Sequence, residues 1–155
     1  MSPSISFFNS KDISRIAFFC FGNRDRSDDA FGLMVGDELV KIFPNNVFTE
    51  ELEDISTFLI DIVDTDRFDG VVIIDALDYG AKAGSILLTS DISNHVKSIS
   101  SHAIPLTEIY EFIQLKGKDF LLIGAQAKKI DFMGNPTNET FQAVKEVLDI
   151  FQTPK

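Results

Sequence analysis

Hydrophobic and polar positions along this chain change between two spacings, which predicts strands and helices in alternation. Short apolar runs rich in β-branched and aromatic residues are typical of buried strands. We place strands at 15–21, 47–52, 71–74, 85–89 and 120–124. Apolar residues three and four positions apart predict helices at about 29–43, 56–63, 105–113 and 138–151. This order favours a three-layer α/β/α fold, in which a mostly parallel, twisted sheet of about five strands is flanked by helices on both faces.

Local signals predict how several of these elements begin and pair. Asp28 or Asp29 is placed to cap the first long helix, and Ser56 the next one. The strand 85–89 follows the previous strand after a short turn, and this predicts an antiparallel neighbour because a parallel crossover needs a dozen or more residues. The last helix is expected to point four apolar residues inward: Phe141, Val144, Val147 and Leu148.

The length and apolar content fit one domain with a substantial core. The chain has 155 residues, of which 45% are hydrophobic and 15 are Phe. No internal repeat, linker or low-complexity segment interrupts it. We therefore expect a single domain over 1–155, in which 1–14 form an N-terminal extension, and a monomer.

The charge balance narrows the classes of partner. The chain carries 14 Lys and Arg against 24 Asp and Glu, a net charge of -10. Such a surface repels the phosphates of nucleic acids and anionic membranes, so neither is an expected partner. A metal ion or a basic protein surface suits it better.

Cysteine use and apolar run lengths indicate the compartment. A single cysteine, Cys20, excludes an internal disulfide and a multi-cysteine metal cluster, which fits a reducing cytoplasm. The stretch 1–12 lacks the basic start and apolar core of a signal peptide, and no later apolar run approaches the ~18 residues of a membrane span. We expect a cytoplasmic protein without a membrane partner.

Two adjacent carboxylates, Asp28 and Asp29, follow the first predicted strand in a loop that opens with Gly22 and Asn23. Loops at the carboxyl ends of parallel strands are where α/β sheets carry their sites. Capping a helix uses one carboxylate, which leaves the other to face the crevice. The alternative is that the pair serves only the helix start and its dipole.

Asp75 comes directly after the aliphatic run 71–74, which is the most strand-like stretch of the chain. Burying an unpaired carboxylate costs several kcal/mol, roughly, so a cation or strong donors should lie nearby. An Asp that accepts loop N–H groups is the equally weighted alternative. Asp78, two residues later, fits that turn role better.

His102 lies in the loop before the helix that begins near Pro105. An imidazole there could converge with Asp29 and Asp75 on an open nickel or zinc site, with room for water. A lone surface histidine is the alternative, and His95 is expected to be one.

Familiar nucleophile and nucleotide motifs are absent from the sequence. Cys20 lies inside the Phe-rich first strand, where a buried thiol keeps a high pKa and stays inert. No Gly-x-Ser-x-Gly elbow is present, and Gly22 belongs to no phosphate-binding glycine motif.

Four segments in order resemble the maturation endopeptidases of nickel-iron hydrogenases. The opening loop has the family's Gly-Asn, spacer, acidic pair and following Gly, and the run 72–80 resembles its central strand and Asp-Ala turn. The histidine segment 101–106 and the late strand ending at Gln126 complete the likeness, which extends over about 15–150. The chain departs from the family pattern at Ala30, where many members carry Gly, in the charged spacer 24–27, and after Gln126, where a proline is often found.

The resemblance implies a peptide-bond hydrolase that removes a C-terminal extension from the precursor of a hydrogenase large subunit, its protein partner. It implies that Asp29, Asp75 and His102 form the catalytic, metal-binding site, with Asp28 as an auxiliary carboxylate. It also implies that the nickel belongs to the substrate, that other divalent metals can substitute, and that cleavage is of an aspartyl or metal-assisted type. A metal-bound water with Asp28 or another carboxylate as base is our hypothesis for the cleavage step.

Two other classes of protein remain open from the sequence. A phosphoacceptor receiver domain also has an acidic pair after its first strand, an Asp after its third and a Lys after its fifth, which Asp28-Asp29, Asp75 and Lys128 could mimic. Against it, the six residues 22–27 separate the pair from the strand. A non-catalytic metal-binding interaction module of the same fold is the second alternative.

Overall fold

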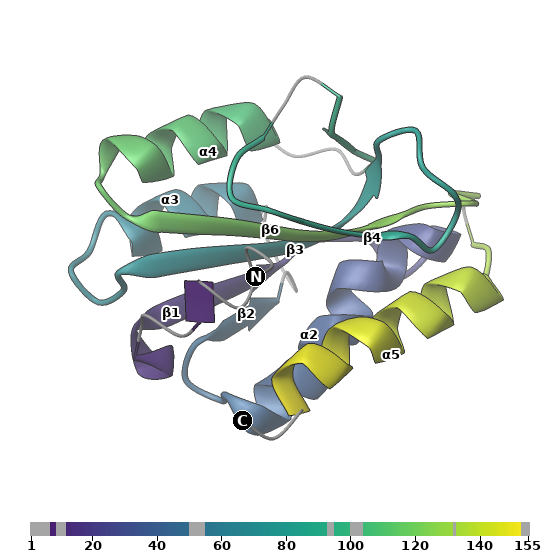
Figure 1. The fold of residues 1–155 in the computed structure, drawn as a ribbon, viewed down its shortest axis with the longest axis horizontal. Coiled ribbons are helices and arrows are strands. Elements are labelled where there is room, and N and C mark those ends of the chain that lie inside the picture. Colours follow the sequence, from purple (N-terminus) through teal and green to yellow (C-terminus); the bar gives the residue numbers. More distant parts are fainter. Residues whose placement is uncertain are drawn as a thin grey trace.

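In the described part of the chain, a mixed six-stranded sheet lies between two layers of helices, which confirms the predicted three-layer α/β/α fold (Figure 1). The structure is a computed structural model and describes residues 7–8, 12–49, 55–92, 95–99, 104–131 and 133–152. The strands are β1 Ile16–Cys20, β2 Val47–Thr49, β3 Gly70–Asp78, β4 Ile86–Thr89, β5 Lys97–Ser98 and β6 Asp119–Gln126. The helices are α2 Phe31–Ile42, α3 Ile55–Val63, α4 Leu106–Leu115 and α5 Asn138–Gln152, with short 3-10 turns η1 Ile13–Arg15 and η2 Ser27–Ala30.

The order of the strands creates a switch point next to β1. The sheet runs β2-β1-β3-β6-β4, with β1, β2, β3 and β6 parallel to one another. The chain passes from β1 through α2 to β2 on one side, and then through α3 to β3 on the other side of β1. Open α/β sheets bind ligands where the winding direction changes in this way. The crevice at the carboxyl ends of β1 and β3 is therefore the expected place for a site.

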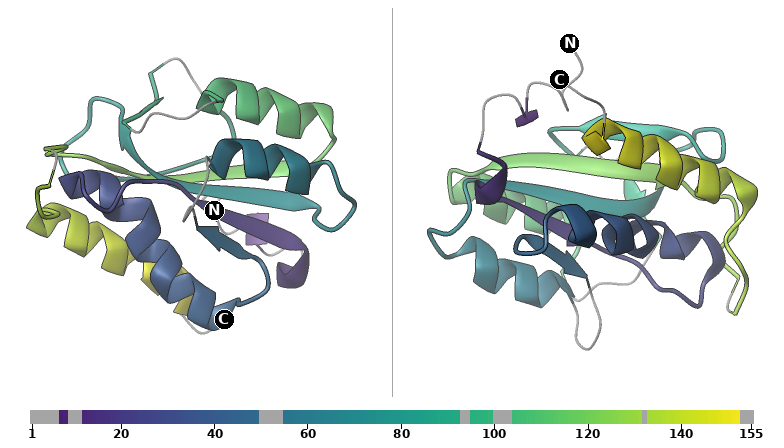
Figure 2. Two further views of the ribbon diagram at one scale, coloured as in Figure 1. Left: turned by 180° about the vertical axis from the view of Figure 1, so that it is seen from behind. Right: turned by 90° about the horizontal axis from the view of Figure 1, so that it is seen from below.

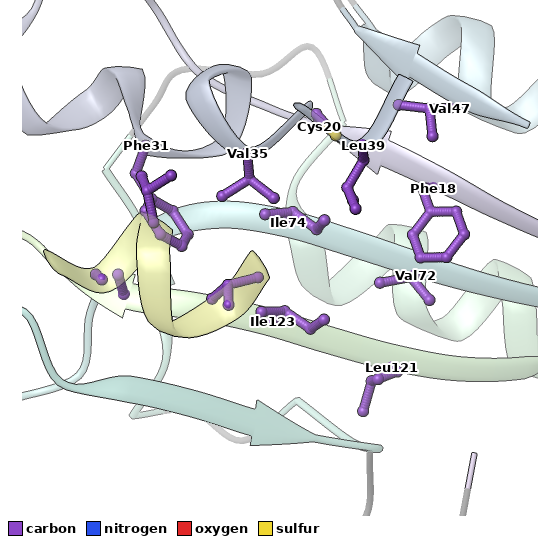
Figure 3. Close-up of a cluster of buried hydrophobic side chains, with 14 of the residues drawn as sticks. Phe18, Cys20, Phe31, Val35, Leu39, Val47, Val72, Ile74, Leu121 and Ile123 are labelled. Atoms are coloured by element: carbon purple, nitrogen blue, oxygen red, sulfur yellow. The ribbon is translucent and has the colours of Figure 1, made fainter. Parts of the chain in front are cut away.

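Each face of the sheet has its own hydrophobic core. Helices α2 and α5 lie side by side on one face, and α3 and α4 cover the other (Figures 1 and 2). In Figure 3, Phe31, Val35 and Leu39 of α2 lie over Ile74 of β3, with Phe18 of β1 in the same buried cluster. Because both faces of the central strands are covered, β1 and the first part of β3, up to Ile74, are apolar at consecutive positions rather than at alternate ones.

Several sequence expectations about single elements were wrong in detail. The strand 85–89 does have an antiparallel neighbour, but β4 pairs with β6 rather than with β3, whose two sides are taken by β1 and β6. Strand β5 was not predicted, because Lys97 and Ser98 give no apolar run. Phe141, which we expected to point inward, is 47% exposed, whereas Ala143, Val144 and Val147 are buried.

The cap of the first long helix also differs from the expectation. Ala30 is the N-cap of α2 and makes no side-chain cap bond, so neither Asp28 nor Asp29 caps the helix. Both aspartates belong to η2 and are buried. Ser56 lies inside α3, and its Oγ accepts a hydrogen bond from the N–H of Ile104. No helix in the described part of the chain is long and apolar enough to cross a membrane.

Candidate functional site

The site begins where β1 leaves the sheet and β5 enters it on the same side of β3. The last β1 residue, Cys20, pairs with Ile74, and the N–H of Phe21 donates to the carbonyl of Ile74 (2.9 Å). Further along, the N–H of Ile99 donates to the carbonyl of Ala76 (3.4 Å), directly after β5. Asp75 lies between these two contacts. Among the described residues, β3 therefore has no regular strand partner on this side next to Asp75, its one buried acidic residue.

Asp75 lies inside β3 rather than at its end as predicted, because β3 continues to Asp78. Alternation along the strand puts its side chain on the same face as Ile73 and Leu77, which pack towards α3 and α4. Asp75 is fully buried, and the hydroxyl of Ser98 donates to its Oδ2 at 2.6 Å. The short strand β5 therefore supplies a hydrogen-bond donor that the sequence did not signal.

Asp29 reaches the same edge through the loop after β1. Gly22 is required there because a Cβ on it would lie 2.3 Å from the carbonyl oxygen of Asp29, which itself accepts from the N–H of Asn23 (3.0 Å). A Cβ on Gly32 would lie 2.1 Å from the carbonyl oxygen of Phe21, so the start of α2 presses against the strand ends. Asp29 is fully buried, and Arg26 Nη1 lies 3.3 Å from its Oδ2.

Asp28 is held by hydrogen bonds from the loop between β6 and α5, and its auxiliary role in the reaction stays a prediction. Its Oδ2 accepts from the backbone N–H groups of Lys128 (2.8 Å) and Lys129 (3.0 Å), and its Oδ1 from the N–H of Thr137 (2.7 Å). The hydroxyl of Thr137 contacts both oxygens. Burial alone would raise the pKa of Asp28, but these bonds and one from Thr140 outweigh it, so the pKa is lowered. Asp28 ties the loop between β6 and α5 to the loop after β1.

Gln126 and Asp78 hold the turn that follows β3. Gln126 Oε1 accepts from the N–H groups of Tyr79 (2.9 Å) and Ala81 (3.2 Å), and its Nε2 donates to Asp78 Oδ1 (3.2 Å). Asp78 also accepts from the N–H of Gly80, which confirms the turn role expected for it. The late Gly-x-Gln segment thus fixes the turn that follows β3.

The remaining residues with a predicted role are the two histidines and the cysteine. His102 lies outside the described residues, so its place as the third member of the site stays a prediction. Over the described ranges, no group of three His, Cys, Asp or Glu side chains is arranged to hold a metal ion. His95 is exposed, as expected. Cys20 is buried, and this burial raises the pKa of its thiol, which confirms it as a core residue.

Arg26 is a site residue that sequence reasoning missed. Its guanidinium contacts Asp29 three positions later and also the carbonyl of Ile99 (3.5 Å). The signal was present in the sequence, since a basic residue three positions before an acidic one can meet it within a single turn. We had noted only that the spacer was charged.

Comparisons with known proteins agree with one another on the family. The family model of HycI, hydrogenase maturation protease, matches residues 54–151, which is more than half of the chain. A Methanocaldococcus jannaschii protein is 29% identical over 83% of this chain and 88% of its own length, and its name assigns it by inference as a hydrogenase maturation protease.

Solved structures of such proteases share the fold. The nickel-iron hydrogenase maturation protease HycI from Thermococcus kodakarensis matches with a TM-score of 0.72 at 24% identity, over 89% of this chain and 90% of its own. The hydrogenase maturating endopeptidase HybD from Escherichia coli matches with a TM-score of 0.66 at 20% identity, over 89% of this chain and 92% of its own.

The receiver-domain alternative is wrong. Lys128, which would have to approach the phosphoacceptor, instead forms an exposed ion pair with Glu139 (2.8 Å). The buried acidic edge, the HycI family match and the shared fold all point to one assignment: this chain is a protease that belongs to the HycI family of hydrogenase maturation proteases.

Proposed function

We propose that this protease removes a C-terminal extension from the nickel-loaded precursor of a nickel-iron hydrogenase large subunit. The observation that carries the proposal is a pair of fully buried carboxylates: Asp29 in η2, which follows β1, and Asp75 in β3, directly after the part of β3 that pairs with β1. Buried carboxylates demand positive charge, and a divalent cation bound to a substrate would provide it.

The donor set suits nickel brought by the substrate. Asp29 in η2 and Asp75 in β3 offer oxygen ligands, and we propose His102 as the nitrogen ligand. His102 follows Ile99 by three positions, and the carbonyl of Ile99 contacts the same guanidinium as Asp29. The precursor's own metal ligands would complete the coordination, and other divalent metals could take nickel's place.

The structure changes our hypothesis for the proton transfers. Asp28 is a poor general base, because both its oxygens already accept several hydrogen bonds and its pKa is lowered. Asp75 is better placed, since it lies in the central strand β3 and the Ser98 hydroxyl, which donates to its Oδ2, orients the group. When bound, nickel would polarise the scissile carbonyl and lower the pKa of a coordinated water. We propose that Asp29 and Asp75 position the substrate's metal and that Asp75 accepts the proton.

The test compares nickel-loaded and nickel-free precursor of a candidate large subunit incubated with the protease. We expect mass spectrometry to detect loss of a C-terminal peptide only from the loaded form. Asp29→Asn, Asp75→Asn and His102→Ala should each reduce the rate at least about a hundredfold, as loss of a preorganised charged group does. Asp61→Asn, on the exposed side of α3, is the matched control and should cleave normally. Equal cleavage of both precursor forms would refute the role of nickel.

A further inference from the structure

The guanidinium of Arg26 lies between the Asp29 carboxylate and the backbone of Ile99. Its Nη1 is 3.3 Å from Asp29 Oδ2 and 3.5 Å from the Ile99 carbonyl oxygen. The side chain of Asp29 is 0% exposed, whereas that of Arg26 is 28% exposed. Arg26 therefore brings a positive charge to a carboxylate removed from water while its own side chain still reaches solvent.

This ion pair is loose in comparison with the others formed by arginines in the described residues. Charge-assisted N–H to carboxylate bonds are typically about 2.7–2.9 Å long. Arg24 donates to the Asp37 carboxylate from two nitrogens at 2.8 and 2.9 Å, and Arg15 donates to the Asp69 carboxylate from two nitrogens at 2.6 and 2.8 Å. Arg26 approaches Asp29 through one nitrogen at a longer distance. Another cation can replace such a contact at a smaller loss of binding energy.

The backbone of Arg26 is fixed, so only its side chain needs to move. Its N–H donates to the carbonyl of Asn23 (3.3 Å), and its carbonyl accepts from the N–H of Asp29 (3.0 Å). Arg26 also forms a bridge with Gly134, and the N–H of the next residue, Ser27, donates to the Gly134 carbonyl (3.0 Å). Ser27 holds a φ of 51°, a left-handed conformation that needs such support. Rotation of the Arg26 side chain can therefore remove its guanidinium from Asp29 without rearranging the loop.

We propose that Arg26 is the internal counter-cation of Asp29 in the substrate-free protease, and that a metal ion must displace it to reach this carboxylate. The inference rests on the proposed function, in which Asp29 contacts the substrate's nickel. A free ion has only its own ligand bonds to drive the displacement, whereas a metal held in a precursor arrives with additional protein contacts. Arg26 thus makes the site selective for a protein-borne metal over free ions.

The consequence is measurable as metal affinity. Apparent affinity falls in proportion to the fraction of molecules in the competent state, here those in which Arg26 has left Asp29. We expect Arg26→Gln to bind free Ni²⁺ about tenfold more tightly than the wild type, or more, as couplings between two sites commonly do. Arg26→Lys, which keeps the charge, should stay close to the wild type. Arg24→Gln removes an equal charge from the same loop and is the matched control, with no expected change.

The experiment is calorimetric titration of each metal-free protein with Ni²⁺, repeated in an Asp29→Asn background. Tighter binding that depends on Asp29 supports the proposal, since a merely structural role of Arg26 would weaken the site instead. If Arg26→Gln is unfolded without metal, recovery of folded protein on adding Ni²⁺, absent when Asp29→Asn is added, gives the same support. Unchanged or weaker Ni²⁺ binding by Arg26→Gln, or an equal gain in Arg24→Gln, would overturn it.

The outcome is separate from that of the proposed function. Nickel-dependent cleavage by the wild type that is lost in Asp29→Asn would uphold the proposed function even if Arg26→Gln binds Ni²⁺ no better. Loss of nickel dependence in the wild type would refute the proposed function itself.

Discussion

Replacing Asp28 by Asn should destabilise the protease strongly, although it changes only one atom and removes one charge. In the folded protein, Oδ2 of Asp28 faces the N–H groups of Lys128 and Lys129, and Oδ1 faces the N–H of Thr137. A carboxamide must point its NH₂ at one of these two sets of donors. At least one part-buried N–H then loses its acceptor, whichever way the amide is turned.

The magnitude follows from the bonds that are lost. A hydrogen bond to a charged group contributes about 1.5–3 kcal/mol, and an unsatisfied buried donor costs about 1–3 kcal/mol. We expect Asp28→Asn to lower the free energy of unfolding by about 3 kcal/mol. For a domain of this size, that corresponds to a fall in Tm of about 6–12 °C.

Urea unfolding followed by circular dichroism measures the free energy, and limited trypsin digestion locates the damage. Lys128 and Lys129 lie in the loop that Asp28 holds, so the variant should be cut there faster than the wild type. Asp25→Asn is the matched control, since Asp25 is exposed in the same loop, and it should stay within about 0.5 kcal/mol of the wild type.

The stability difference between the two proteins should also depend on pH. The pKa of Asp28 is lowered in the folded state, so its stabilisation is present above the pKa of the unfolded chain and is lost as pH falls through the folded-state pKa. The advantage of the wild type over Asp28→Asn should therefore shrink on acidification below about pH 5. A Tm difference below about 2 °C at pH 7, or a difference that grows at low pH, would refute this reasoning.

Two further predictions concern the buried thiol of Cys20 and the turn that follows β3. Burial raises the pKa of the Cys20 thiol, so a thiol-specific reagent should label Cys20 only when the protein unfolds, and the treated native protease should keep its cleavage activity. Rapid labelling of the native protein with loss of activity would contradict this. Gln126→Leu removes the acceptor of the Tyr79 and Ala81 N–H groups, so it should lower the free energy of unfolding in urea by about 2 kcal/mol. The control Gln142→Leu, on the exposed side of α5, should lower it little, and equal effects of the two changes would contradict the prediction.

The fold could be predicted from the sequence because its strongest signals are local. The apolar run at 71–74 and the helical spacing of Phe31, Val35 and Leu39 each reflect a face buried against the sheet. Strand β5 escaped prediction because a strand of two polar residues exists only by pairing with Leu77 and Asp78. Phe141 was misplaced because helical spacing defines a stripe but not its edges, and α5 turns Ala143 inward instead.

The site was partly predictable for a related reason. Asp29 and Asp75 stood out because charged residues beside apolar strands are unusual, and the structure buries both of them, Asp29 in η2 and Asp75 inside β3. The role of Asp28 could not be read from the sequence, since its partners lie at least 100 positions away and are mostly backbone groups that carry no sequence signature. Ser98 was missed because an ordinary serine becomes a donor to Asp75 only through the pairing of β5.

The break between β1 and β5 limits the way in which a peptide can approach Asp75. Peptides often bind by adding a strand to an open sheet edge, which requires vacant backbone acceptors. On this side of β3, the carbonyl groups of Ile74 and Ala76 already accept from Phe21 and Ile99, and β6 pairs along the opposite side. A polypeptide therefore cannot extend the sheet beside Asp75 without displacing one of these residues. The peptide bond to be cut should instead approach across the strand ends, in a segment with no regular structure. A substrate in which the segment around this bond is folded into a strand or helix would have to unfold that segment first.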